Sequence, residues 1–187
     1  MKKFLAVLLV ACLWVGSVLA DVWSDTSLDY VIAGAASGTC ANAVNQACSD
    51  QEWAATYYDT VYAREQTAIN SGLLTAGQMW ELIGSMESAS DNISQGNGYM
   101  TAALNFQSAG DADVAAGQGY YTTALGQQQN NPQLAATNCA RADSWFQDAI
   151  NNQYIPGAQR ANNADGAFMS AISTLCDTDA FLAQLGF

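Results

Sequence analysis

The sequence predicts an all-α protein, either an antiparallel helical bundle or a short stack of helical hairpins with about 22 residues per helix–turn unit. Apolar residues recur at the spacing of one helix face, and no segment alternates polar and apolar residues with a period of two over a useful length. The third observation is a phrase that occurs twice. Residues 96–104 read Gly-Asn-Gly-Tyr-Met-Thr-Ala-Ala-Leu and residues 117–125 read Gly-Gln-Gly-Tyr-Tyr-Thr-Thr-Ala-Leu, an offset of 21 residues.

The repeated phrase reduces to one helix face. A small residue is followed four positions later by an aromatic residue or Met, and at positions seven and eight by Ala and then Leu or Ile, so that all four side chains lie on one side of a helix. The face begins at Gly96, Gly117, Ala142 and Ala164, and in looser form at Ala54 and Ala76. These starts are 20 to 25 residues apart, which corresponds to one helix of about four turns and a short connection.

The last two copies of this face are Ala142, Phe146, Ala149, Ile150 and Ala164, Phe168, Ala171, Ile172. They resemble the second helix of a tetratricopeptide repeat, whose pattern is Ala, then Tyr or Phe, then Ala-Leu. That family alternates two different helices over about 34 residues and has a Trp and a Leu-Gly in the first helix. Here every helix carries one pattern, so the resemblance covers half of the family's repeat and implies shared helix packing rather than membership.

Residues 1–20 have the pattern of a secretory signal peptide. Lys2 and Lys3 form a positively charged start, residues 4–15 form an apolar core, and Val-Leu-Ala at residues 18–20 is a small-residue cleavage site. One alternative is a membrane anchor, for which the apolar run is short. Another is a lipoprotein acylated at Cys12. We therefore expect a secreted or extracytoplasmic protein, in the periplasm or at the cell surface, with residues 21–187 as a single all-helical domain and no transmembrane span in the mature chain.

Four cysteines remain after cleavage, and an even number in an exported chain predicts two disulfides. Of the three possible pairings we favour Cys40–Cys48 and Cys139–Cys176. The first requires a helix break near residues 38–39, because eight residues of one straight helix rise about 12 Å. The second requires a helical hairpin that turns near residues 154–157.

Local signals predict where helices begin and end. A short amphipathic helix is expected at residues 25–37. Expected helix starts are capping boxes at residues 49–52 and 75–78, a turn with a capping Asp at residues 110–113, and Pro at the first helical position at Pro132 and Pro156. The helix that starts near residue 49 should end at about Asn70 and be closed by Gly72. The next helix either breaks at residues 90–92 or continues to Ser108, and a short last helix is expected at residues 178–185.

The predicted mature chain is strongly acidic. All 17 Asp and Glu residues follow Ala20, and only three arginines and no Lys or His oppose them, so the net charge is −14. Such a chain repels phosphates and anionic membrane surfaces, which excludes nucleic-acid binding. The absence of His and Lys excludes His-based triads, Schiff-base chemistry and the phosphate-binding Lys of a P-loop.

Carboxylates are the remaining catalytic groups. They permit one alternative function, a small extracytoplasmic glycosidase-like hydrolase with paired carboxylates, whose candidates are Glu65, Glu81 and Glu87. Glu65 follows Trp and Tyr side chains along nearly one helix face, so we expect it to be partly buried beside Arg64 or another Arg. The competing interpretation is a carboxylate at the rim that pairs with an Arg.

No cofactor or metal site is expected. The acid pairs at residues 111 and 113 and at residues 177 and 179 are interpreted as helix caps, because neither continues into a twelve-residue calcium loop with a closing Glu.

Aromatic residues are the best binding candidates. Trp53, Tyr57, Tyr120 and Trp145 would suit stacking on sugar rings or docking a hydrophobic partner, and core packing is the competing interpretation. In the Tyr pairs at 57–58 and 120–121 only one ring can point directly inward, so we expect the other to line a groove. We therefore favour a non-catalytic binding or structural role outside the cytoplasm, with a protein, glycan or cell-envelope partner, and leave the oligomeric state open.

Overall fold

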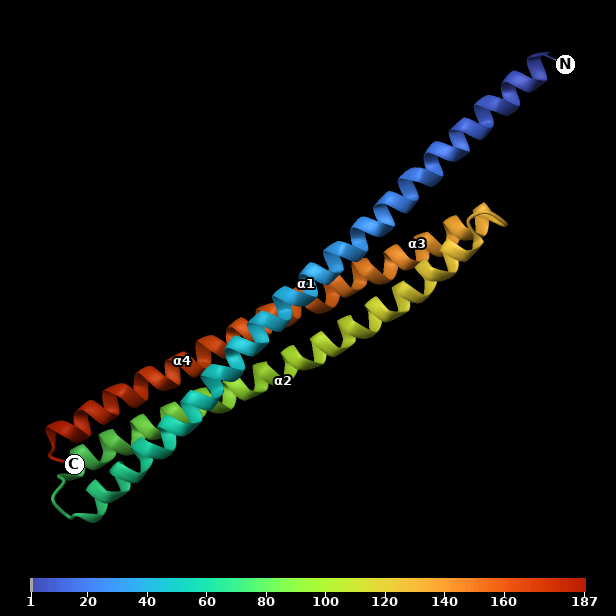
Figure 1. Cartoon of the computed structure of the whole chain (residues 1–187). Helices are drawn as coiled ribbons and strands as arrows, with labels where there is room; N and C mark the ends of the chain where they lie inside the picture. The colour runs from blue at the N-terminus through green and yellow to red at the C-terminus, as the bar shows by residue number, and fades with distance from the viewer. Residues whose placement is uncertain (1) are drawn as a thin grey trace. The chain divides into compact units, whose positions relative to one another are not determined.

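The computed structural model describes the backbone of residues 2–187 and the side chains of residues 22–187. The elements in order are α1 (Lys2–Asn70), α2 (Ala76–Gln127), α3 (Pro132–Asp148), the π-helix η1 (Ala149–Tyr154) and α4 (Ile155–Gln184) (Figure 1). Residues 2–187 contain no strand, and the predicted all-α fold class is confirmed. The signal peptide expected at residues 1–20 and the alternative acylation site Cys12 lie outside the described side chains, so both stay predictions.

The chain divides into two compact units. Unit 1 comprises Met1–Thr39 and Phe106–Ile155, and unit 2 comprises Cys40–Asn105 and Pro156–Phe187. In unit 1, side chains from α1, α2, α3 and η1 pack around Phe146. In unit 2, side chains from α1, α2 and α4 pack around Leu82 and Leu175. Each unit is therefore a helical bundle with its own core.

Small residues at a spacing of seven form the buried faces of the helices. On α1 the fully buried set is Thr26, Ala33, Cys40, Ala47, Ala54, Val61 and Ala68. On α2 the buried set is Leu82, Ala89, Gly96, Ala103, Gly110, Gly117 and Ala124. A seven-residue period is typical of left-handed supercoiled helices, because it keeps one face toward the partner helix. The 21-residue offset of the repeated phrase is three such periods within α2, so the repeat lies along one continuous helix and is not interrupted by turns.

Aromatic rings pack directly on the glycines of α2. In unit 1, a Cβ atom added to Gly117 would stand 2.5 Å from Cε1 of Phe146, and one added to Gly110 would stand 2.6 Å from Cε1 of Tyr154. In unit 2, a Cβ atom on Gly96 would overlap the ring of Phe168. These glycines are required for space rather than for backbone conformation, which explains why the repeated phrase begins with Gly at 96 and 117.

The π-helix η1 inserts one residue into the seven-residue pattern. Buried small residues recur at Ala135, Ala142 and Ala149, and the next one, Gly157, follows after eight residues rather than seven. A π turn has wider i→i+5 bonding and accommodates the extra residue. It also lies just before Pro156, which has no N–H to donate and whose ring would clash with the carbonyl four residues earlier in a regular α-helix. The prediction that Pro156 starts a separate helix is therefore wrong, because the chain is helical on both sides of it.

Three predicted helix boundaries are confirmed, the end of α1 and the starts of α2 and α3. Helix α1 ends at Asn70, and Gly72 has a positive φ of 68°. In the second capping box the backbone N–H of Gln78 donates to Oγ1 of Thr75, and the backbone N–H of Thr75 donates to Oε1 of the Gln78 side chain. At α3 the side chain of Asn131 accepts from the Leu134 amide, with Pro132 at the first helical position.

Other predicted boundaries are wrong. Residues 49–52 lie inside α1, residues 110–113 lie inside α2, and residues 178–184 belong to α4 rather than to a separate short helix. Residues 90–92 are helical, so the predicted break there is wrong, and α2 continues beyond the predicted end at Ser108 to Gln127. Capping residues inside a helix find other partners, as where Gln46 donates to Oδ2 of Asp50 at 2.9 Å. Burial of the continuous small-residue face outweighs these local signals.

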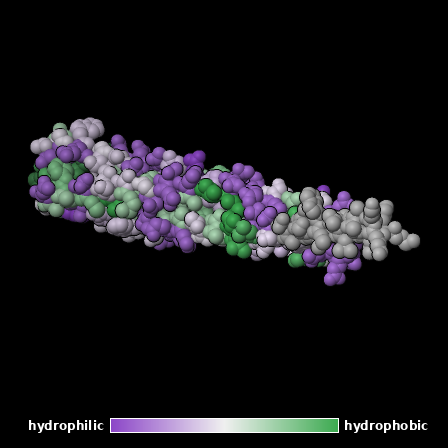
Figure 2. Space-filling model, turned by 90° about the horizontal axis from the view of Figure 1, so that it is seen from above, coloured by the Kyte–Doolittle hydropathy of each residue, from purple (hydrophilic) through white to green (hydrophobic). Residues whose placement is uncertain are grey.

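The surface carries both polar and apolar areas. On the face shown in Figure 2, hydrophilic residues cover much of the surface, with narrower hydrophobic areas between them. Large apolar side chains are exposed in both units, for example Val31 in unit 1 and Trp80 in unit 2. Within the part of the chain whose side chains are described, no helix combines the length and apolar character that a membrane span needs.

Candidate functional site

A hollow between α1 and α2 in unit 2 brings together aromatic, acidic and apolar side chains. It has a volume of about 490 Å³. Its lining residues are Tyr58, Tyr62, Glu65 and Gln66 from α1, and Ile83, Met86, Glu87, Ser90 and Asp91 from α2. We call it the α1–α2 hollow. The spacings of about four and seven residues place each lining set on one helix face.

Two tyrosines form one side of the α1–α2 hollow. The rings of Tyr58 and Tyr62 are nearly parallel, with an interplanar angle of 8° and centroids 6.0 Å apart. They lie four residues apart on α1, where side chains stack one above the other along the helix. Tyr58 also packs against the core of unit 2, whereas Tyr62 is exposed. Core packing therefore fixes the ring of Tyr58, and the ring of Tyr62 is accessible to solvent.

Glu65 is the buried acid of the α1–α2 hollow. The residue is only 2% exposed, and its Oε2 accepts a hydrogen bond of 3.3 Å from Nε2 of Gln66. Its Oε1 accepts no hydrogen bond from any described residue, but it is not one of the buried unpartnered oxygens, so it is in contact with solvent. Desolvation raises the pKa of the Glu65 carboxyl, and the hydrogen bond from Gln66 opposes this shift. The side chain is therefore a poorly compensated carboxylate at the edge of an open space.

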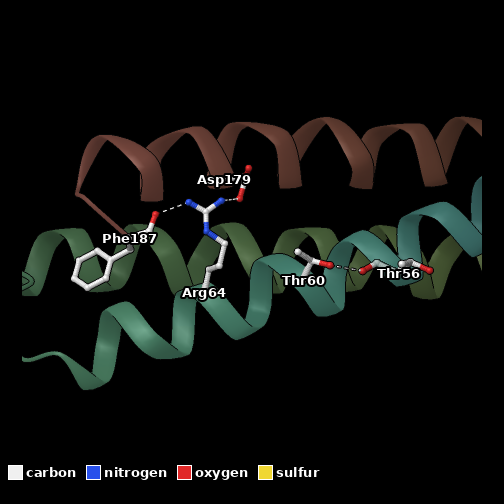
Figure 3. A network of polar contacts seen from close by, with 5 residues as sticks. All are labelled: Thr56, Thr60, Arg64, Asp179 and Phe187. Carbon is white, nitrogen blue, oxygen red and sulfur yellow. Dashed lines mark hydrogen bonds and ion pairs between the residues drawn. The ribbon is translucent and has the colours of Figure 1, made fainter.

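The predicted Arg partner of Glu65 is absent. Arg64 forms an ion pair with Asp179 and donates to the backbone carbonyl of Phe187, and Figure 3 shows both contacts. The same view shows Thr60 donating to the Thr56 carbonyl on α1. Consecutive residues on a helix point about 100° apart, so Arg64 reaches the end of α4 while Glu65 faces α2. The expectation of a Glu65–Arg pair, whether partly buried or at a rim, is thus corrected.

The three predicted catalytic candidates separate into two groups. Glu65 and Glu87 line the α1–α2 hollow, together with Asp91, which sequence reasoning missed. Glu81 is exposed and does not line it. Asp91 was detectable in principle, because it lies four residues after Glu87 on the same helix face.

A smaller hollow lies in unit 1. It has a volume of about 280 Å³ and is lined by Tyr30, Gln118, Tyr121 and Thr122. Nε2 of Gln118 donates to the Tyr30 hydroxyl at 2.6 Å, and the ring of Trp23 lies 5.9 Å from that of Tyr121. Its lining contains no charged side chain, so it lacks the electrostatic character of the α1–α2 hollow.

The predicted binding aromatics are divided between the two units. Trp53 and Tyr57 belong to unit 2, whereas Tyr120 and Trp145 belong to unit 1. Trp53 and Trp145 are exposed, at 52% and 38%. Tyr57 and Tyr120 are half-buried and pack against the two cores. Their roles in binding stay predictions.

Both rings of each Tyr pair pack against a core, and one ring of each pair also lines a hollow. The lining rings are Tyr58 and Tyr121, rather than Tyr57 and Tyr120. The rotation of each helix about its axis decides which ring faces the hollow, and that rotation is set by the buried seven-residue face.

The predicted cysteine pairs are not bonded to each other. Among residues 22–187 the structure contains neither a Cys40–Cys48 nor a Cys139–Cys176 disulfide. The first two lie on one continuous helix, whose rise of about 12 Å over eight residues exceeds the Cα separation that a disulfide allows. The pairing of the other two depended on a turn near residues 154–157, where the chain is helical.

The acid pairs interpreted as caps lie inside helices. Asp111 accepts a hydrogen bond of 2.7 Å from the Tyr154 hydroxyl, and Asp179 pairs with Arg64. Among the residues with described side chains, no group of three His, Cys, Asp or Glu side chains is placed to hold a metal ion.

No protein-family model matches the chain, and searches of curated proteins and of solved structures found no similar protein. Function is therefore inferred from the geometry and chemistry of the α1–α2 hollow.

Proposed function

We propose that this protein is an exported, acidic, non-catalytic binding protein, and that its ligand occupies the α1–α2 hollow. The observation that carries the proposal is the combination, in one concave site, of the stacked Tyr58–Tyr62 pair and the buried carboxylate of Glu65. A volume of about 490 Å³ lies within the range of small-molecule sites. Such sites combine aromatic and apolar walls with a few polar groups, and Ile83 and Met86 supply the apolar part here. The ligand is a small molecule, or a group presented by a protein, glycan or cell-envelope partner.

Binding at this site is tested by comparing two aromatic truncations. Tyr62→Ala removes the exposed ring of the hollow, and Trp80→Ala is the matched control, because it removes an exposed ring of the same unit that does not line the hollow. The measurement is a thermal-shift screen with amines, sugars and small aromatic acids. We expect some compounds to raise the melting temperature of the wild type and of Trp80→Ala, but not that of Tyr62→Ala. A screen with no shift, or a shift retained in Tyr62→Ala, would contradict the proposal.

Export is supported by the charged, apolar and small-residue segments of residues 1–20. The test is the intact mass of the protein collected from the medium and from the cell envelope. We expect the mass of residues 21–187. A mass that includes residues 1–20, or that begins at Cys12 with an added lipid, would replace this with the anchored alternatives.

A hydrolase that uses paired carboxylates is the second candidate, because Glu65 and Glu87 line one hollow in different environments. Glu65 is buried with a raised carboxyl pKa, which suits a general acid, while Glu87 is exposed. Glu65→Gln and Glu87→Gln should then each abolish turnover of a chromogenic glycoside, whereas Glu81→Gln should not. Equal rates in all three variants would exclude this candidate.

A further inference from the structure

We infer that the α1–α2 hollow takes an organic cation, with a protonated amine or guanidinium group against Glu65 and an aliphatic or aromatic body along the tyrosine rings. This inference rests on the proposed binding function of the hollow and specifies the chemical class of its ligand.

The charge of the lining favours a cation. Glu65, Glu87 and Asp91 contribute three carboxylates, and no Arg lines the hollow. The mature chain has no Lys or His to add. In unit 2 both arginines have other partners: Arg64 pairs with Asp179, and the guanidinium of Arg160 lies 5.8 Å from the centroid of the Tyr99 ring. The protein therefore supplies no positive charge of its own to this site.

Glu65 presents a carboxylate oxygen to the hollow. Desolvation raises the pKa of the Glu65 carboxyl, so its surroundings destabilise the charged form. Oε1 of Glu65 accepts no hydrogen bond from a described residue, and it is not one of the buried unpartnered oxygens, so it is in contact with the solvent of the hollow. A cationic N–H donor in the hollow would replace that solvent and offset the desolvation of the carboxylate.

The tyrosines define the rest of the ligand. The faces of aromatic rings attract cations, and the chain already uses this contact twice, between Arg141 and Tyr120 and between Arg160 and Tyr99. Tyr58 and Tyr62 present two parallel rings beside Glu65, and Ile83 and Met86 form an apolar wall. An inorganic ion would leave these surfaces uncovered, whereas an amphipathic organic cation covers them and reaches the acid.

The test is an NMR titration of the full exported protein with matched probes. Butylguanidinium and butylammonium carry the charge, n-butanol is the neutral analogue and butyrate is the anionic one. We expect amide shifts confined to residues 58–66 and 83–91, and an affinity at least tenfold higher for the cations than for n-butanol. A capped tripeptide with a central Arg distinguishes the sources: tighter binding than butylguanidinium indicates a peptide side chain, and weaker binding indicates a free small cation. Either result supports the inference.

Two variants separate specific recognition from diffuse attraction. Glu65→Gln keeps the shape of the side chain and removes its charge, and it also removes a destabilised buried carboxylate, so the fold should persist. Glu81→Gln removes the same charge from an exposed position outside the hollow. We expect Glu65→Gln to weaken cation binding at least tenfold and Glu81→Gln to leave it unchanged. Tyr62→Phe should retain binding, whereas Tyr62→Ala should weaken it.

Three results would overturn the inference. If n-butanol binds as tightly as the cations, the hollow is a binding site without charge selectivity, and the proposed function stands alone. If Glu81→Gln weakens binding as much as Glu65→Gln, the cations respond to the overall negative charge. If no probe of any charge perturbs the hollow, and the screen of the proposed function also finds no ligand, both proposals fail together.

Discussion

Units 1 and 2 share the same seven-residue pattern of small buried residues but build different cores on it. In unit 1 one buried cluster consists of Ala33, Ala142, Phe146 and Ile150, and Tyr154 is also fully buried. In unit 2 one cluster is aliphatic, with Val61, Leu82, Met86, Leu175 and Leu182 in addition to two alanines, and Phe168 is also fully buried. Among the described side chains, buried leucines occur only in unit 2, so we expect unit 2 to be the more stable unit.

Polar groups differ in the same direction. Among the described side chains, the buried oxygens without a hydrogen-bond partner are Oδ2 of Asp113 and Oδ1 of Asp143, both in unit 1. Unit 2 instead contains the Arg64–Asp179 ion pair. Unpartnered buried oxygens cost free energy, so they should lower the unfolding free energy of unit 1. The comparison suggests why the α1–α2 hollow lies in unit 2: the larger aliphatic core there can support a concave surface and the buried Glu65.

The largest expected effect comes from removing an aromatic ring. Phe146→Ala in unit 1 and Phe168→Ala in unit 2 are a matched pair, because each ring packs on a glycine of α2. Each should cost about 3–5 kcal/mol of unfolding free energy through lost burial and a residual cavity. Hydrogen exchange should show Phe146→Ala lowering protection mainly in unit 1, and Phe168→Ala lowering it less in unit 2, where leucines remain. Equal loss in both units from either variant would mean that the units unfold as one.

The glycines beneath these rings give the next largest effect. Gly117→Ala in unit 1 and Gly96→Ala in unit 2 insert a methyl group where a ring already lies, and should cost about 1–3 kcal/mol through overpacking. Gly119→Ala and Gly98→Ala are controls two residues away, with no atom within 4 Å of the added Cβ. The controls should stabilise the helix by about 0.5–1 kcal/mol. Denaturant unfolding measures all four, and destabilisation by Gly119→Ala would show that the ring contact is not the cause.

The sequence predicted the fold class and the two true connections. Helical periodicity without strand alternation is a property of the whole chain, and the turns need residues that local rules identify, such as Gly72 at positive φ and Pro132 behind Asn131. Signals inside the helices misled, because Ser49 and Pro156 favour helix starts only when no tertiary contact competes. The sequence nevertheless contains a pattern that predicts long continuous helices. Small residues at every seventh position from Ala33 to Ala54 predict continuous supercoiled helices, and an offset of 21 is a multiple of seven.

The candidate site was partly predictable. The run of aromatic residues before Glu65 correctly indicated a buried acid on α1. The sequence could not predict that Glu87 and Asp91 face it, because that depends on the register between α1 and α2. Nor could it predict that Arg64 turns toward Asp179, which is 115 residues away in the chain. Contacts between residues so far apart follow from packing, which local patterns do not encode.

Pairs of neighbouring carboxyl groups should have a smaller effect on stability, and in both units they should lower it as the pH rises. In unit 2, a hydrogen bond that the protonated Asp165 carboxyl donates to Asp50, desolvation and the charge of Asp50 raise the pKa of Asp165 to about 6. In unit 1, desolvation and the neighbouring Asp148 raise the pKa of Asp113. A carboxyl group with a raised folded-state pKa binds its proton more tightly in the folded protein. Its contribution is therefore fully present below pH about 4 and is lost as the pH rises through about 6.

Asp165→Asn tests this in unit 2. At pH 7 it should raise the unfolding free energy by no more than about 1 kcal/mol, because solvent screens a partly exposed pair, and it should flatten the stability profile between pH 4 and 6. Asp177→Asn, at an exposed position of the same helix, is the control and should leave the profile unchanged. Thermal melts across pH 3–8 measure both. A wild type that becomes more stable from pH 4 to 7 would contradict the assigned direction.

The smallest expected effect concerns the ion pair that only unit 2 has among the described side chains. Arg64 and Asp179 are each about one-third exposed, so their attraction is screened and the pair should contribute about 0.5 kcal/mol. Arg64→Met keeps much of the apolar stem and removes both the pair and the donor to the Phe187 carbonyl. We expect a small loss of stability that disappears at high salt, together with faster hydrogen exchange near residue 187. If Arg64→Met costs more than about 2 kcal/mol, the ion pair contributes more than its exposure suggests, and the greater stability of unit 2 would owe as much to electrostatics as to its leucines.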